Sequence, residues 1–167
     1  MKVQVMVYGT LMRGERNHRH MTGARFVREA RTAARFTLVD RSADRLLDMA
    51  RGMNAGVLNA AVFGGKILAQ GADRTNIYAY REAPPTVLNA IREMEALCSS
   101  FEVPLAAAAL QFSLRDARID TTVVGLSTAQ QVKDTLRLSA IPIPDALWPQ
   151  LEELRPPPAY WIDAPSG

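Results

Sequence analysis

Two glycine-containing segments of the chain combine residue types that can bind a phosphate group. Gly125-Leu-Ser-Thr-Ala-Gln130 follows an apolar run and precedes a helical pattern, so backbone N–H groups and the helix dipole could converge there on an anion. Phe63-Gly-Gly-Lys66 follows another apolar run, and its lysine supplies a cation. A structural interpretation is also open: Ser127 or Thr128 is the N-cap of the next helix, and the glycines serve the loop conformation.

Other residues with chemical potential are few. The two histidines, His18 and His20, lie two residues apart in a predicted loop without carboxylates beside them to complete a metal site. The single cysteine, Cys98, lies on the apolar face of a predicted helix and is expected in the core. No Ser-His-Asp, Cys-His, G-x-G-x-x-G or Walker pattern is present. The sequence therefore predicts no metal site and no catalytic residue.

Charge and hydropathy restrict the partners and the compartment. The net charge is +3, but beyond the cluster at residues 13–35 basic residues are interspersed with acidic ones, so no nucleic-acid-binding stripe is predicted. No apolar run reaches the roughly 18 residues that span a bilayer, and residues 1–4 do not begin a signal peptide. With one cysteine, these features favour a cytoplasmic protein that binds neither membrane nor nucleic acid.

The apolar period changes between residues 35 and 42. Up to Asp40 the chain has β-like alternation, at residues 2–8, 25–27 and 35–39. From Ser42 the spacing is helical, as far as Gly52 or Gly56. This change marks a predicted boundary between two parts of the chain.

Beyond that boundary predicted strands and helices alternate. Apolar runs predict buried strands at residues 57–61 and 121–124. The predicted helices cover residues 86–101, 105–114, 129–138 and 145–154. In the third of these, Val132, Leu136 and Leu138 are expected to face inward. Strands separated by helices pair in parallel through right-handed crossovers, so the predicted fold class is α/β.

The opening segment resembles the gamma-glutamylcyclotransferase-like family through Tyr8-Gly9-Thr10-Leu11 and the β-like runs that follow to residue 40. The resemblance implies that Tyr8, Gly9, Thr10 and Leu11 bind substrate, largely through backbone groups, and that a later strand supplies a catalytic glutamate. It ends near Asp40, and neither Glu15 nor Glu29 matches the position of that glutamate. Cyclotransferase chemistry therefore lacks its base.

From about residue 35 to 155 the chain resembles the C-terminal part of the aldo-keto reductases, in the branch of the L-fucose, L-galactose and D-threo-aldose dehydrogenases. The segments that carry the resemblance lie at residues 36–43, 57–64, 67–69, 77–80, 103–112 and 122–125. They imply a partial (β/α) barrel, the last three βα units of eight, with an added N-terminal β-rich segment. The expected domains are residues 1–40, residues 41–155 and a tail, 156–167.

This second resemblance also implies a site for a nicotinamide nucleotide. The residues matched to the part of the family that holds the cofactor's phosphates and adenosine are Phe63, Gly64, Gly65, Leu68, Gly125, Leu126, Ser127, Thr128, Gln131 and Thr135. Ser127 stands where many relatives have an Arg or Lys for a 2′-phosphate, which favours NAD over NADP. The family's catalytic Asp, Tyr, Lys and His have no match, since they belong to strands without a counterpart here. No cofactor is therefore required, and NAD(P) binding would be weak.

Three hypotheses follow for function. The first is a chimeric or rearranged protein, natural or engineered, that folds but lacks catalytic activity. The second is a weak nucleotide-binding module. The third is an enzyme of one parent family: an NAD(P)-dependent oxidoreductase completed by a partner chain, or a gamma-glutamylcyclotransferase-like enzyme. An open part of a barrel leaves strand edges uncovered, so a homodimer or higher homo-oligomer is expected.

Overall fold

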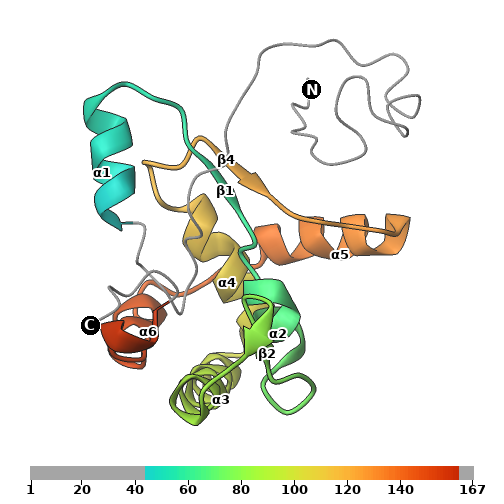
Figure 1. Ribbon diagram of the computed structural model, residues 1–167. Helices are drawn as coiled ribbons and strands as arrows, with labels where there is room; N and C mark the ends of the chain where they lie inside the picture. The colour runs from blue at the N-terminus through green and yellow to red at the C-terminus, as the bar shows by residue number, and fades with distance from the viewer. Residues whose placement is uncertain (1–43, 162–167) are drawn as a thin grey trace, which may run out of the picture. The chain divides into compact units, whose positions relative to one another are not determined.

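The computed structural model describes residues 44–161 (Figure 1). All of them belong to the C-terminal unit, residues 32–167, of the two units into which the chain divides. The β-like runs before Asp40, the strand predicted at 35–39 and the boundary at residue 40 lie outside the described residues, as do residues 162–167 of the tail.

Helices and short strands alternate along the described chain, which makes it an α/β structure as predicted. The helices are α1 (Asp44–Gly52), α2 (Ile67–Gln70), α3 (Pro85–Ser100), α4 (Leu105–Leu114), α5 (Ala129–Ala140) and α6 (Leu147–Glu153). The strands are β1 (Leu58–Ala60), β2 (Ile77–Tyr78), β3 (Arg81–Glu82) and β4 (Thr121–Val123). Turns of 3-10 helix are η3 (Gly64–Lys66) and η4 (Pro158–Tyr160). The predicted helices are confirmed to within a few residues at each end.

The strands β1 and β4 pair in parallel, which confirms the predicted pairing. Leu58 lies opposite Thr121, Asn59 opposite Thr122, and Ala60 opposite Val123. The chain between them passes through α2, the β2–β3 hairpin, α3 and α4, because a parallel pair needs a long crossover connection. Residues 44–161 form no closed barrel, since β1 and β4 make a two-stranded sheet.

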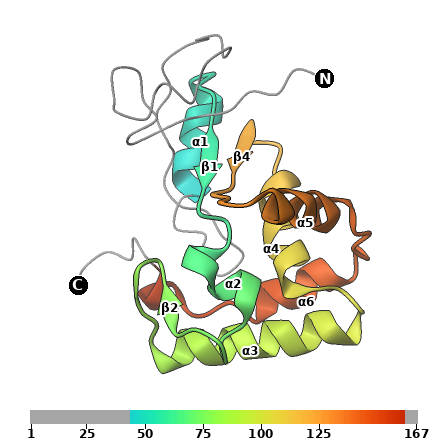
Figure 2. The ribbon, with the colours of Figure 1, turned by 90° about the vertical axis from the view of Figure 1, so that its right-hand side faces the viewer.

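The prediction that residues 121–124 form a buried strand is wrong in its degree of burial. All three residues of β4 are half-buried, whereas Asn59 and the neighbouring Val57 at β1 are buried. The helix α4 packs against β4 (Figure 2). Within residues 44–161, β4 pairs only with β1 and packs on α4, which leaves its residues half-buried.

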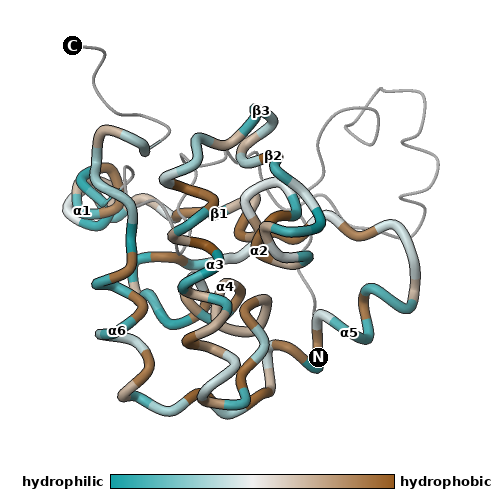
Figure 3. Tube along the Cα trace, turned by 90° about the horizontal axis from the view of Figure 1, so that it is seen from below, coloured by the Kyte–Doolittle hydropathy of each residue, from teal (hydrophilic) through white to brown (hydrophobic). Residues whose placement is uncertain are grey.

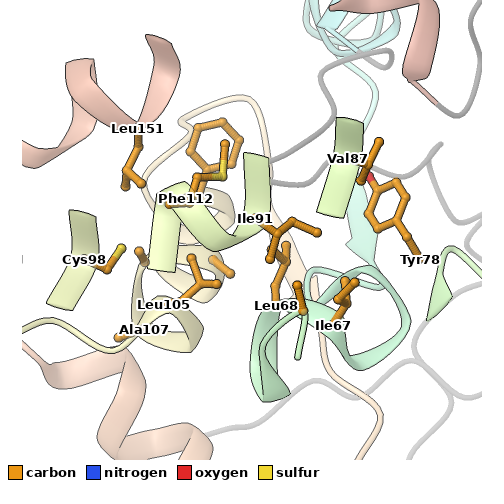
Figure 4. Packing of buried hydrophobic residues seen from close by; sticks show 14 of the residues in the cluster. Ile67, Leu68, Tyr78, Val87, Ile91, Cys98, Leu105, Ala107, Phe112 and Leu151 are labelled. Carbon is orange, nitrogen blue, oxygen red and sulfur yellow. The ribbon is translucent and has the colours of Figure 1, made fainter. Parts of the chain in front are cut away.

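The core lies where α2, α3, α4 and α6 meet. Helix α3 buries Val87, Ile91, Met94 and Cys98, a spacing that places them on one face (Figure 4). Helix α4 is buried almost all round, and its run Ala107, Ala108, Ala109 lets α2, α3 and α5 pack closely on it. Seen from below, apolar segments of α2, α3 and α4 lie close together at this centre (Figure 3).

Helix α6 closes the core through Trp148. The guanidinium carbon of Arg115 lies 4.2 Å from the centre of the Trp148 ring, and the Phe112 ring is 6.5 Å away. A cation over the face of an indole is attracted by the ring's quadrupole. Both partners of Trp148 come from α4 or directly after it, so these contacts fix α6 to α4.

Helix α5 departs from the predicted packing. Val132 is 44% exposed and Leu136 is 63% exposed, so the prediction that they face inward is wrong, while Leu138 packs against the core. The cause is that α4 holds only the C-terminal end of α5: Gln111 Nε2 donates to the carbonyl oxygens of Leu138, at 2.8 Å, and Ile141, at 2.7 Å.

Within residues 44–161 no single helix is long and apolar enough to cross a membrane. Helices α3 and α4 pass that test of length and composition only as a pair, and the chain bends by 97° between them.

Candidate phosphate-binding turns at the strand ends

The carboxyl ends of β1 and β4 lead into the two segments that were predicted to bind phosphate. Because the strands are parallel and in register, both segments leave the sheet at the same end, where α/β folds commonly bind ligands. Beyond β1 the chain turns into η3 and α2, whereas beyond β4 an extended stretch carries it away to the start of α5 (Figure 1). The described structure therefore does not bring the two segments together in one pocket.

The turn between β4 and α5 is built around the side chain of Gln131. Its Oε1 atom accepts hydrogen bonds from the Ser127 amide at 2.8 Å, the Ser127 hydroxyl at 3.0 Å and the Thr128 amide at 3.2 Å. In return Thr128 Oγ1 accepts from the Gln131 amide at 3.1 Å, which completes a capping box. The interpretation of Thr128 as the N-cap is confirmed. Three donors converge here on one oxygen atom.

The other predicted residues of this segment are less constrained. Gly125 and Leu126 are exposed, and Thr135 is half-buried in the second turn of α5. A Cβ atom added at Gly125 would meet nothing within 4 Å. The fold itself therefore does not require a glycine at this position.

The loop between β1 and α2 is tightly wound. Gly64 and Gly65 have φ of +58° and +88°, and Lys66 has a φ of 130°, which is unusual for a residue with a side chain. The Gly64 carbonyl accepts from the Ala79 amide at 3.0 Å, and a Cβ at Gly64 would lie 2.7 Å from the Tyr78 ring. Gly64 is thus required by the hairpin that packs on the turn.

The side chains of the same loop have separate roles. Leu68 is buried and Phe63 packs partly against the core, so these two predicted site residues can offer a ligand only backbone groups. Lys66 is exposed and has no ion-pair partner among residues 44–161. It is the residue of this loop with a charge available to an anion.

A charge cluster at the amino ends of β1 and β4 has no counterpart in the sequence-based predictions. Arg118 donates to Asp116 Oδ2 at 2.6 Å, Asp44 Oδ1 at 2.6 Å and Asp48 Oδ1 at 2.7 Å. Hydrogen bonding to Asp116, followed by that to the other two carboxylates, raises the pKa of Arg118 above its ordinary value despite partial burial. The cluster ties α1 to the segment that leads into β4.

Two other predicted features can be located. Cys98 is buried in α3, as predicted, and burial together with the nearby Glu95 carboxylate raises the pKa of its thiol from 9.0 to about 11. Among residues 44–161 no group of three His, Cys, Asp or Glu side chains could hold a metal ion. His18 and His20 lie outside the described residues, as do Tyr8, Gly9, Thr10 and Leu11.

A shallow hollow of about 390 Å³ lies away from the turn before α5. It is formed where α2 meets the end of α3 and the start of α4, with Gly71, Glu95 and Glu102 in its lining. Of the predicted site residues only Leu68 reaches it. The hollow is therefore separate from the donors around Gln131.

Two parallel strands joined by helices define an α/β protein, and three hydrogen-bond donors converge in the turn after β4. The chain belongs to the aldo-keto reductase family: the model of the Aldo/keto reductase family matches residues 4–156. That match includes most of residues 1–40. Among these comparisons nothing supports a gamma-glutamylcyclotransferase segment or a join between two families.

Two curated relatives illustrate the similarity. The chain is 36% identical to a D-threo-aldose 1-dehydrogenase of Pseudomonas sp over 138 residues, which cover 78% of this chain and 42% of that protein. It is 28% identical to a Pyridoxal 4-dehydrogenase of Microbacterium luteolum over 120 residues, which cover 71% of this chain and 35% of that protein. The chain thus spans less than half the length of both relatives.

Proposed function

We propose that this chain carries the part of an aldo-keto reductase that holds the phosphate end of a nicotinamide nucleotide, and that the turn before α5 is the phosphate-binding element. The observation that supports the proposal is the convergence of the Ser127 and Thr128 donors on a single oxygen atom. A phosphate oxygen is an acceptor of the same geometry and carries more negative charge than a carboxamide oxygen. The donor set therefore fits a phosphate group.

The residues of this chain would divide the binding between them. Ser127 and Thr128 would donate their amides and the Ser127 hydroxyl, after Gln131 has released them. The amides of Ala129 and Gln130, in the first turn of the 12-residue helix α5, lack acceptors within the helix and point the same way. With Ser127 in place of an Arg or Lys, the proposed preference is for NAD over NADP.

This chain alone is proposed to have no catalytic activity. When bound, a nicotinamide nucleotide supplies hydride transfer, but no residue here matches the family's catalytic Asp, Tyr, Lys and His. The cyclotransferase alternative and a chimeric origin both rest on the resemblance of residues 8–11. A cyclotransferase activity would likewise lack its catalytic glutamate. Neither aldehyde reduction nor release of 5-oxoproline from gamma-glutamyl peptides is expected above a buffer blank.

Self-association is part of the proposal. Apolar side chains are exposed on α1 at Leu46 and Met49, directly after α1 at Met53, and on α5 at Val132 and Leu136. Exposed apolar side chains grouped on a helix favour association with another surface. Sedimentation at micromolar concentration should give a mass above the 18.4 kDa of one chain, and a monomer would contradict this part of the proposal.

Fluorescence titration of NADH and NADPH, with ADP as competitor, tests the nucleotide site. We expect weak binding of NADH, with a dissociation constant of roughly 1 mM, which corresponds to a binding free energy of about 4 kcal/mol. The reason is that the family's affinity is spread over more contacts than this chain offers. ADP should displace NADH, and adenosine should not. Displacement by adenosine as effective as by ADP would show that the phosphate is not what the chain holds.

A further inference from the structure

Three polar side chains from three separate elements meet behind the β1–β4 pair. Asn59, in the middle of β1, is fully buried, and its Nδ2 atom donates to Ser113 Oγ of α4 at 2.8 Å. The Ser113 hydroxyl, 1% exposed, lies 2.7 Å from Thr122 Oγ1 of β4. Asn59 and Ser113 are the buried polar residues of the described chain. We call these three side chains the Asn59–Ser113–Thr122 cluster.

Burial makes the cluster sensitive to geometry. A buried amide or hydroxyl that loses its hydrogen-bond partner destabilises the fold, because the free energy spent on removing it from water is no longer offset. At an exposed site, water would replace the lost partner. Thr122 can reach Ser113 only when it lies opposite Asn59, as it does in the observed register. Ser113 of α4 bonds to both strands, so a slip of β4 against β1 would break its contact with Thr122.

The apolar residues of the two strands do not select a register by themselves. Leu58 and Ala60 of β1 face the same side as Thr121 and Val123 of β4, and all four are half-buried. A slip by two residues would keep every side chain on its face and move the strands by about 7 Å. A one-residue slip would instead turn Asn59 away from α4.

We propose that the Asn59–Ser113–Thr122 cluster sets the register of β1 against β4, and so fixes where the phosphate-binding turn starts relative to the loop of Phe63–Leu68. Asn59 lies at the centre of β1 and not in either turn. It would therefore act as a positioning residue, through the register of the strands and not through contact with a ligand. The importance of this position for ligand binding rests on the proposed function, whereas its effect on register does not.

Disulfide trapping measures the register directly. In a Cys98→Ala background, which removes the single cysteine of the chain, Ala60→Cys with Val123→Cys reports the observed register, because these residues are opposite each other. Ala60→Cys with Thr121→Cys reports a two-residue slip. With no other substitution, the full-length chain that carries the first cysteine pair should form a disulfide readily. The chain that carries the second pair should form hardly any.

Variants of the cluster should change that ratio. Asn59→Leu and Ser113→Ala should lower in-register cross-linking relative to slipped cross-linking by about fivefold to tenfold, the range expected when a buried hydrogen bond is lost. Thr122→Val should have a smaller effect in the same direction, and Thr122→Ser, which keeps the hydroxyl, should restore the parent ratio. Leu151→Ala in α6 is the control, because it destabilises the core away from both strands.

The outcomes separate register from simple stability. If Ser113→Ala and Thr122→Val keep the parent ratio, the proposal is overturned, even if Asn59→Leu fails to fold. An equal change in the ratio of in-register to slipped cross-linking in Leu151→Ala would also overturn the proposal. The cause would then be a general loss of stability and not the loss of the cluster. ADP-induced amide shifts at residues 125–131 should weaken in the cluster variants; if the parent shows no such shifts, the proposed function fails while the cross-linking result still stands.

Discussion

The two ends of the β1–β4 pair differ in the side chains that bind their charged groups and backbone amides. At the amino end, Arg118 is 15% exposed and its donors reach three carboxylates, while the Asp120 carboxylate accepts from the Val57 amide at 2.6 Å. At the carboxyl end the turn before α5 is exposed, and its amides are held by a neutral side chain of the same helix. Ion pairs hold the amino end, whereas at the carboxyl end the turn before α5 is exposed.

This difference matches a division of labour seen in parallel α/β folds, where one end of the strands contributes stability and the other binds ligands. An ion-paired end cannot exchange partners without leaving charges unmatched in a partly buried place. A carboxamide oxygen can leave its donors with little loss when a better acceptor replaces it. The comparison predicts large effects on folding at one end and modest effects on binding at the other.

Arg118→Ala should cause the largest loss of stability. It would remove a guanidinium that bonds to the Asp116 carboxylate, 14% exposed, and to that of Asp44. The expected loss is about 3 kcal/mol in the free energy of unfolding, measured by urea denaturation. Arg137→Ala is the matched control, since its pair with Asp134 is exposed, and should change stability by less than about 0.5 kcal/mol. Similar losses in both variants would remove the distinction drawn for the amino end.

Cys98 reports on the core that α2, α3, α4 and α6 form. With a thiol pKa raised to about 11, the thiolate is disfavoured in the folded chain, so stability should fall as pH rises from about 9 toward 11. At pH 8, labelling by a disulfide reagent should be about a hundredfold slower in the folded chain than in urea. Labelling should accelerate in Arg118→Ala and not in Gln131→Ala. Rapid labelling of the parent would contradict the buried, protonated thiol.

Gly64→Ala and Gly125→Ala separate the two turns of the carboxyl end. Gly64 has φ of +58° and lies against Tyr78, so alanine should cost about 2 kcal/mol of stability. Gly125 has open space around it, and alanine should change stability by less than about 0.5 kcal/mol. Thermal unfolding of both variants checks this, and equal losses would show that the turn before α5 is as constrained as the loop after β1.

Gln131→Ala should change ADP binding only slightly, and the direction of that change is informative. Removal of the competing oxygen should strengthen ADP binding by roughly twofold to threefold, at a cost of about 1 kcal/mol in helix capping. Gln131→Glu should weaken binding, because a carboxylate would hold the amides and repel phosphate. Gln130→Ala, whose side chain bonds Asp134, is the control. Weaker ADP binding in Gln131→Ala would instead make Gln131 a ligand, as the family resemblance implied.

The sequence predicted the elements better than their packing. Periodicity located α3 and α4 because their buried faces, such as Val87 to Cys98, repeat at helical spacing. It failed at Val132 and Leu136, since an amphipathic pattern does not reveal that α5 is anchored only at its end by Gln111. The sequence offered Ser127 or Thr128 as the N-cap, and the structure selects Thr128 with Gln131 in a capping box, whereas the Arg118 cluster joins residues up to 74 positions apart. Asn59 within an apolar run was the available signal for the buried polar cluster.

An ADP titration followed by amide chemical shifts in the full chain tests the central claim most directly. The account predicts saturable shifts at Gly125 to Gln131, with a dissociation constant of roughly 1 mM, and no comparable shifts at the amino end around Asp116 to Asp120. Adenosine should leave the turn unshifted. Shifts concentrated elsewhere, or an unperturbed turn at saturating ADP, would contradict the assignment of phosphate binding to the turn before α5.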